Sequence, residues 1–297
     1  MSDLASPPRI IVTGATSIIG RFLLPRLVNA GYEVHAISRN CRENPGETDK
    51  KVFWHPVDIA HPEQLPRVDA QALIHLAPLW LLPPLLPVLS SFQIKRVIGF
   101  GSTSLFSKAK SADAGEQQLV ARFVAAEEAI TRLSSTLEMN WTVFRPTLVY
   151  DCVHDKNIAV IARFIQRYGF FPLLGEASGL RQPVHADDLA GACIMALNQP
   201  LTFCRAYNVS GGETLSYRQM VERIFNSLGK SARFLIIPAW LFRGAIRVVM
   251  LLPGKRSMTP EMAMRMNVDL CFDHADATRD FGFSPRPFLP CWEDPTK

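Results

Sequence analysis

The residues whose types and spacing could do chemistry begin near the amino terminus, in the stretch TGATSIIG at positions 13–20. A β-branched run at 10–12 precedes this stretch, and apolar residues at helical spacing follow it from Ile18 onward. A strand, a glycine turn and a helix in this order leave the first N–H groups of the helix unpaired at the positive end of its dipole. The stretch therefore predicts a site for the pyrophosphate of a cofactor.

The spacing of these residues resembles the TGxxGxxG loop of the short-chain dehydrogenase/reductase superfamily, and specifically its extended, epimerase/dehydratase-like branch. Ser17 stands where the family loop has its middle glycine. Because a residue with a Cβ tolerates positive φ poorly, we expect Ser17 at negative φ, with its hydroxyl on a phosphate oxygen. An ordinary turn between a strand and a helix shares this pattern, so the assignment of a cofactor-binding loop depends on further motifs in the rest of the chain.

The end of the second expected strand, residues 33–38, indicates which dinucleotide would bind. In dinucleotide folds an acidic residue at this point bonds the ribose 2′-OH, whereas an arginine accommodates a 2′-phosphate. Arg39 follows the strand at once and the next acidic residue is Glu43, which favours NADP over NAD. An exposed arginine at a strand end is the structural alternative. The net charge of +5 comes from scattered basic residues, which suits a phosphorylated ligand and argues against nucleic acid.

Further blocks extend the resemblance to about Gly229. They include HLA at 75–77, RP at 145–146 and VHADDLA at 184–190, where we expect a strand and then a helix capped by Asp187. In the family the equivalents of Asp58 and Ile59 meet the adenine ring, and the RP pair flanks the nicotinamide. His75 is expected to be structural. The resemblance implies that the cofactor-binding residues are Gly14, Thr16, Ser17, Ile18, Ile19, Gly20, Arg39, Asp58, Ile59, Leu76, Ala77, Pro78, Ser102 and Pro146.

The proton-transfer pair of the family is missing. In the family a Tyr-x-x-x-Lys pair, one turn apart on a helix, exchanges a proton with the substrate while hydride moves to or from the nicotinamide. The corresponding helix is expected over 115–137, and its Ala126-Glu127 resembles the end of the family motif. Counting back from there puts Leu119 at the tyrosine position and Phe123 at the lysine position. No tyrosine in the chain is followed four residues later by lysine.

Two functions from different classes follow. The first is an NAD(P)-dependent reductase, dehydrogenase or epimerase-like enzyme, in which Ser102 or Thr103 and an ordered water replace the tyrosine. The resemblance places Ser102, after a strand at 96–101, on the substrate oxygen beside the nicotinamide. The second is a cofactor-binding module that senses redox state or supports an assembly. The retained Ser102 region favours the enzyme, and the loss of both tyrosine and lysine favours the module. A substrate would be a small molecule, apolar or nucleotide-linked.

The resemblance also implies the architecture. It predicts an α/β fold, with a Rossmann-type doubly wound parallel sheet and a smaller C-terminal substrate-binding subdomain that is mainly helical. We expect the NAD(P)-binding domain over 1–151, with a returning segment at about 181–212, and the subdomain over 152–297. With 297 residues, 48% of them hydrophobic, the chain can bury cores of this size.

Two apolar segments raise the question of a membrane. Residues 76–92 hold four prolines, which excludes a regular membrane-spanning helix. Residues 238–252 are too short to span a bilayer but could lie in its surface, with Arg243 and Arg247 one turn apart. Burial under neighbouring helices is the alternative that we favour for both. The prolines also interrupt the helix that forms the usual dimer interface of the family, so both a monomer and a homodimer stay open.

Cysteine usage points to the compartment. The six cysteines show no C-x-x-C pair and no zinc-ligand spacing, which indicates reduced thiols and no metal site. Residues 1–8 do not resemble a signal peptide. We therefore expect a cytoplasmic protein, with peripheral contact to a membrane as the alternative.

Overall fold

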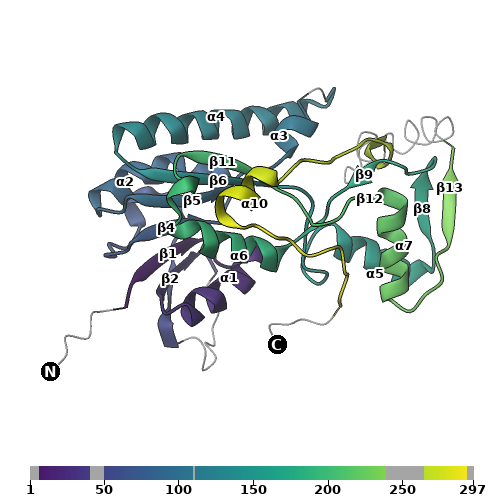
Figure 1. The fold of residues 1–297 in the computed structure, drawn as a ribbon, viewed down its shortest axis with the longest axis horizontal. Coiled ribbons are helices and arrows are strands. Elements are labelled where there is room, and N and C mark those ends of the chain that lie inside the picture. The colour runs from purple at the N-terminus through teal and green to yellow at the C-terminus, as the bar shows by residue number, and fades with distance from the viewer. Residues whose placement is uncertain (1–6, 41–49, 110, 239–263, 293–297) are drawn as a thin grey trace.

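The computed structural model describes residues 7–40, 50–109, 111–238 and 264–292. A seven-stranded sheet in the order β11-β6-β5-β4-β1-β2-β3 forms the centre of the molecule (Figure 1), and all its neighbouring strands run parallel. This sheet confirms the predicted α/β fold of the Rossmann type. Its strands are β1 (Arg9–Thr13), β2 (Glu33–Ser38), β3 (Val52–Pro56), β4 (Ala72–His75), β5 (Arg96–Phe100), β6 (Asn140–Pro146) and β11 (Arg205–Val209).

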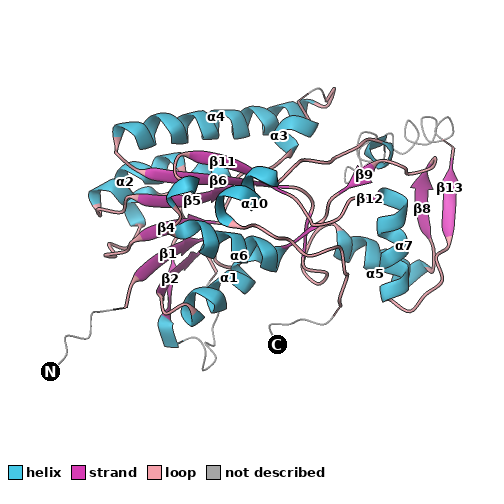
Figure 2. Ribbon diagram, in the orientation of Figure 1, coloured by secondary structure: helices cyan, strands magenta, loops and turns pink. Residues whose placement is uncertain are grey.

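Helices cover both faces of the sheet, which is why its central strands are apolar on both sides (Figure 2). One face packs against α1 (Ile18–Asn29), α6 (Ala186–Leu197) and α10 (Ala275–Phe281). The other face packs against α4 (Ala114–Thr136) and the segment between β4 and β5. Shorter pieces complete this part of the molecule: η2 (Pro62–Gln64), α3 (Ser104–Ser107) and η5 (Pro200–Thr202).

The proline-rich segment 76–92 is buried. It forms η3 (Leu79–Leu81), η4 (Pro83–Leu85) and α2 (Leu86–Ser91). Burial is therefore confirmed for most leucines of this segment. The leucines that lie fully inside the core beside α4 are Leu79, Leu82, Leu85, Leu86 and Leu89.

The second apolar segment, 238–252, lies outside the described residues except for Pro238. Within the described part of the chain, no helix combines the length and the apolar character needed to cross a membrane.

The C-terminal lobe has a core of its own, built around Ile161, Ile165, Ile224 and Phe225. Its two longer helices pack together, and β8 pairs in parallel with β13. β6 ends at Pro146, and the next strand, β7, leaves the central sheet and joins β10 in a separate pair. The lobe comprises β7 (Val149–Tyr150), α5 (Ile158–Tyr168), β8 (Phe171–Leu174), β9 (Leu180–Arg181), β10 (Val184–His185), β12 (Leu215–Ser216), α7 (Tyr217–Ser227), β13 (Phe234–Ile237) and η6 (Arg265–Asn267).

Asp187 does not cap α6 as the sequence suggested. His185 is the N-cap, and its Nδ1 accepts a hydrogen bond from the Asp187 N–H at 3.1 Å. The Asp187 carboxylate instead pairs with Arg26 on α1 at 2.6 Å and with Arg286 at 2.7 Å. Burial would raise the pKa of Asp187, but the two guanidinium groups outweigh it and the pKa lies below its usual value. Two ionic partners thus take the carboxylate that could have capped the helix.

Candidate functional site

The glycine loop of residues 13–20 lies against the carboxyl end of β4. Gly14 has φ +67°, and a Cβ on it would stand 2.6 Å from the Ala77 nitrogen. A Cβ on Gly20 would stand 2.1 Å from the carbonyl oxygen of Ala15. Both contacts are closer than real Cβ atoms come, so each position requires glycine. The loop is thereby held tight against Leu76 and Ala77, two of the predicted cofactor residues.

Ser17 begins α1 and has φ −64°, which confirms the expected negative φ. Its hydroxyl accepts a hydrogen bond from the Gly20 N–H at 3.2 Å, so the side chain caps the helix. The first backbone bond of the helix runs from Arg21 N to Ser17 O at 3.2 Å. The N–H groups of Ile18 and Ile19 therefore have no partner inside the helix and stand at the positive end of its dipole. This arrangement fits a diphosphate.

The end of β2 lies beside the loop. The hydroxyls of Thr16 and Ser38 are 3.0 Å apart, which joins the loop to this strand. Arg39 follows β2 directly and is exposed. Asp58, after β3, accepts a hydrogen bond from the Ala60 N–H at 3.0 Å, while Ile59 is buried in the core beside β4. The structure thus brings Thr16 and Ser38 together next to Arg39, and the adenine contacts of Asp58 and Ile59 stay a prediction.

His75 at the end of β4 is fully buried and holds the loop that follows it. Its Nδ1 lies 2.8 Å from the Thr13 hydroxyl and its Nε2 lies 3.1 Å from the Pro78 carbonyl oxygen. A neutral ring that carries its proton on Nε2 satisfies both contacts. Burial lowers the pKa of His75 to about 4, so the ring is neutral near neutral pH. These contacts fit the structural role that we expected for His75.

Ser102 and Thr103 follow β5, next to the end of β6. The Thr103 hydroxyl is buried and donates a hydrogen bond to the Pro146 carbonyl at 3.0 Å. The Ser102 hydroxyl accepts from the Ser104 N–H at 3.1 Å, and Ser102 is half-buried. Thr103 therefore joins two strand ends, whereas the proton of the Ser102 hydroxyl is still available to a ligand. Of the two candidate catalytic residues, Ser102 has the more exposed side chain, and its contact with a substrate stays a prediction.

The face of α4 that carries Leu119 and Phe123 is apolar. Both side chains pack into the core on this side of the sheet. The Phe123 ring meets the Trp80 ring edge-on at 5.5 Å, and the Arg122 guanidinium lies over Trp80 at 3.8 Å from its centroid. None of these groups exchanges a proton near neutral pH. This part of α4 therefore contributes to the core and provides no group for acid–base chemistry.

An ion pair beside Ser102 was not anticipated from the sequence. Arg145 on β6 donates from Nε to Glu127 Oε1 at 2.9 Å and from its NH2 group to Glu127 Oε2. Arg145 also lies over the Phe106 ring, at 5.3 Å from its centroid. The resemblance implies that Arg145 flanks the nicotinamide, and it assigns no partner to Glu127. The partly buried pair fixes the guanidinium one helical turn beyond Phe123.

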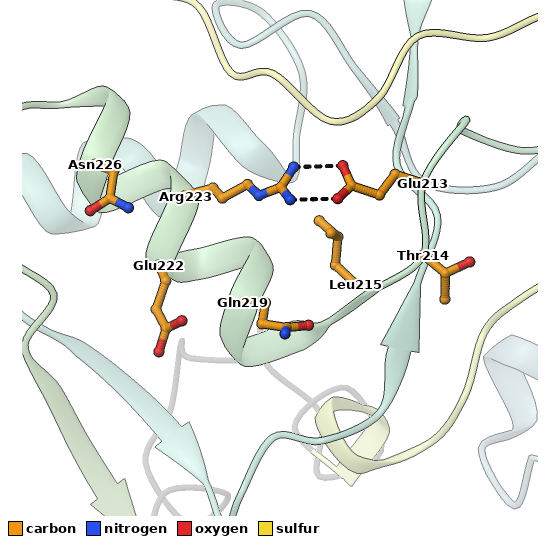
Figure 3. A pocket seen from close by; sticks show the side chains of 7 residues that line it. All are labelled: Glu213, Thr214, Leu215, Gln219, Glu222, Arg223 and Asn226. Carbon is orange, nitrogen blue, oxygen red and sulfur yellow. Dashed lines mark hydrogen bonds and ion pairs between the residues drawn. The ribbon is translucent and has the colours of Figure 1, made fainter.

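A polar hollow lies in the C-terminal lobe between β12 and α7, away from the glycine loop (Figure 3). Glu213 and Arg223 face each other across it and form two hydrogen bonds. Arg223 also donates to the Phe288 carbonyl at 3.0 Å, so the pair anchors the C-terminal segment. This hollow contains none of the predicted site residues. It is best explained as part of the framework of the lobe.

Comparison with known proteins agrees with the arrangement at the glycine loop. Residues 10–79 match the NAD dependent epimerase/dehydratase family. The match makes the amino-terminal part of the chain similar to this epimerase/dehydratase family. The match covers β1, α1, β2, β3 and β4, which carry the loop and most of the predicted cofactor residues. It confirms the resemblance to the extended branch that the sequence motifs indicated.

The relatives that match over more of the chain are distant in sequence. The uncharacterized protein YbjS of Escherichia coli K12 is 24% identical over 93% of both chains. Subunit 9 of the NADH dehydrogenase 1 alpha subcomplex from Dictyostelium discoideum is 22% identical over 75% of this chain and 64% of its own length. A dTDP-glucose 4,6-dehydratase from Streptomyces venezuelae, solved with NAD and TYD bound, has a TM-score of 0.70. It is 17% identical, over 94% of this chain and 92% of its own, and shows that the fold is shared.

Proposed function

We propose that this chain binds a nicotinamide dinucleotide at the amino end of α1, with its diphosphate on the N–H groups of Ile18 and Ile19. The observation that carries the proposal is the loop, where Gly14 and Gly20 admit no side chain and α1 begins directly beside β4. A helix start of this kind favours an anion. The family match covers the same residues, and the Streptomyces dehydratase holds NAD on the same fold.

The preferred dinucleotide is NADP. The side chains at the end of β2 are Ser38, Arg39 and Asn40, and none of them is acidic. An acid here would repel a 2′-phosphate, whereas the exposed guanidinium of Arg39 can pair with it. Thr16 and Ser38 are already hydrogen-bonded to each other, so Arg39 is the group that distinguishes the two dinucleotides.

Binding, rather than sugar epimerisation, is the function that the site supports best. A bound nicotinamide would supply hydride, but proton transfer contributes about 10²- to 10⁴-fold in enzymes of this kind. Leu119 and Phe123 cannot transfer a proton, so they provide none of this rate enhancement. The chain therefore acts as a nucleotide-binding redox sensor or assembly factor. Its relative in Dictyostelium is named as a subunit of an NADH dehydrogenase, which supports a role in an assembly.

Hydride transfer with Ser102 as proton donor is the second candidate. The observation that favours it is the half-exposed Ser102 hydroxyl, whose one described contact leaves its proton to donate. The substrate would be an apolar carbonyl compound, with a nucleotide-linked one as the alternative. Since an unassisted serine has a high pKa, the reaction would be slow.

Cofactor titration tests the first proposal. Tryptophan fluorescence of the wild-type protein is followed with NADPH and NADH, and the titrations are repeated with Arg39→Ala and the control Arg132→Ala. Arg132 is an exposed arginine on α4. We expect NADPH to bind more tightly, and Arg39→Ala to lower NADPH affinity by about tenfold while NADH is unaffected. Equal affinities for NADPH and NADH in both the wild type and Arg39→Ala would refute the NADP preference. If the wild type bound neither dinucleotide, the proposed site would be refuted.

Turnover separates the two candidates. NADPH absorbance is followed with apolar carbonyl compounds and with nucleotide sugars, using wild type and Ser102→Ala. A protein that binds NADPH but oxidises it with none of these compounds supports the binding role. Turnover that Ser102→Ala lowers supports hydride transfer, and turnover that the substitution leaves unchanged excludes Ser102 from the chemistry.

A further inference from the structure

The end of the C-terminal lobe farthest from the central sheet combines exposed apolar and basic side chains. This surface, which we call the lobe end, consists of the carboxyl-terminal end of α5, β8 and β13, with β13 at its outer side (Figure 1). Leu235 and Ile236 on β13 are 54% and 53% exposed, and Tyr168 at the end of α5 is 53% exposed. In the described part of the chain, β13 has β8 as its one partner strand. Within the described residues β13 is therefore an edge strand, and its consecutive residues Leu235 and Ile236, which point to opposite faces of the strand, are each about half exposed.

Charge on the lobe end is of one sign. Residues 156–175 and 228–238 contain no acidic residue. The two stretches lie together, because Phe171 N bonds Arg233 O at 2.9 Å and the Lys230 ammonium bonds Gln166 O at 3.2 Å. Arg167 lies over the ring of Tyr168, at 5.4 Å from its centroid. The basic residues of these two stretches are Lys156, Arg163, Arg167, Lys230 and Arg233.

We propose that the lobe end binds the surface of an anionic lipid bilayer. Leu235, Ile236 and Tyr168 would enter the boundary between headgroups and acyl chains, where tyrosine is favoured. The basic side chains of Arg163, Arg167, Lys230 and Arg233 would lie at the level of the lipid phosphates, which attract them. An anionic lipid surface is favoured over a protein partner because these side chains all carry the same charge, which complements a layer of phosphates. The inference concerns where the protein is held and does not depend on the proposed function.

Vesicle flotation tests the proposal with the full chain. Wild-type protein is mixed with vesicles of phosphatidylcholine alone and with vesicles that also contain phosphatidylglycerol. We expect flotation with the anionic vesicles and little with the neutral ones. Arg163→Gln with Arg167→Gln should lower the partition coefficient about tenfold or more, since each basic residue near the surface contributes to binding. Leu235→Ser with Ile236→Ser should lower it by a similar factor.

Matched controls exclude general effects of charge and hydrophobicity. Arg132→Gln and Leu201→Ser change an exposed arginine and an exposed leucine on the other part of the molecule, and neither should alter flotation. If the β13 variant unfolds, Tyr168→Trp gives an independent reading. Its fluorescence should shift to the blue with anionic vesicles, whereas that of Leu201→Trp should not.

Three results would overturn the proposal. The first is no flotation of wild type with anionic vesicles. The second is flotation that the lobe-end variants leave unchanged, which would place membrane contact elsewhere. The third is a dimer in light scattering that Leu235→Ser with Ile236→Ser dissociates, which would assign the surface to a second copy of the chain.

Discussion

Arg145 and Glu127 form a two-point ion pair beside the candidate site, with Arg145 Nε 2.9 Å from Glu127 Oε1. The pair joins β6 in the sheet to α4 above it. It stands one turn beyond Phe123, so it sets the position of the helix segment that carries Leu119 and Phe123. Because both side chains are largely buried, removal of either charge leaves the other without a partner.

We expect Glu127→Gln to lower the free energy of unfolding by about 1–3 kcal/mol, because the Arg145 guanidinium keeps its burial and loses its counter-charge. Urea unfolding measures the change. Glu128→Gln, on the exposed side of the same helix, is the matched control and should change stability by less than about 0.5 kcal/mol. Equal effects of the two substitutions would show that the ion pair is not a major contact.

Gly20→Ala is expected to lower stability by about 1–3 kcal/mol and to abolish dinucleotide binding, because the new Cβ would meet the backbone oxygen of Ala15. Thermal unfolding and fluorescence titration with NADPH measure the two effects. Gly191→Ala in α6 is the control, since nothing lies within 4 Å of its added Cβ. That substitution should raise stability by about 0.5–1 kcal/mol. A Gly20→Ala protein with unchanged NADPH affinity would contradict the proposed position of the diphosphate.

Ser17 is expected to matter as a helix cap. Ser17→Ala should cost about 1 kcal/mol, whereas Ser17→Gly should cost only a few tenths, because a glycine N-cap leaves the helix start open to water. Ser17→Gly also restores the middle glycine of the family loop, and the protein should still bind NADPH. Urea unfolding of both variants gives the comparison. If Ser17→Ala and Ser17→Gly lowered the free energy of unfolding equally, the hydrogen bond from the Gly20 N–H to Ser17 would not be what stabilises α1.

His75 should make stability depend on pH. Its folded pKa of about 4 lies below the unfolded value of 6.5, so the unfolded chain binds more protons between these values. The contribution of His75 to the free energy of unfolding is therefore fully present above about pH 6.5. It is lost as the pH drops toward 4, which lowers the free energy of unfolding by up to about 3 kcal/mol. His75→Gln removes this titration and should flatten the curve of unfolding free energy against pH. Burial also lowers the pKa values of His55 and His185, so a shallower slope should persist. An unchanged slope in the variant would contradict a neutral buried His75.

The glycine loop and the start of α1 could be predicted from the sequence because their determinants are local. A β-branched run, two glycines and an apolar helical repeat lie within about twenty residues, and each restricts the backbone by itself. The strands of the sheet follow from similar short patterns. The negative φ of Ser17 also follows from local sterics.

The contacts that shape the site were decided by tertiary structure. Asp187 is a residue type that often caps helices. Its carboxylate instead forms ion pairs with Arg26 and Arg286, both of which are far away in the sequence. The partnership of Glu127 with Arg145 crosses from a helix to a strand and follows no fixed spacing. Burial of residues 76–92 was favoured from their sequence, but the partner that covers their leucines, the apolar face of α4, was decided by the tertiary structure. Local sequence restricts backbone conformation, whereas the choice of partner for a side chain depends on which distant groups the fold brings within a few ångströms.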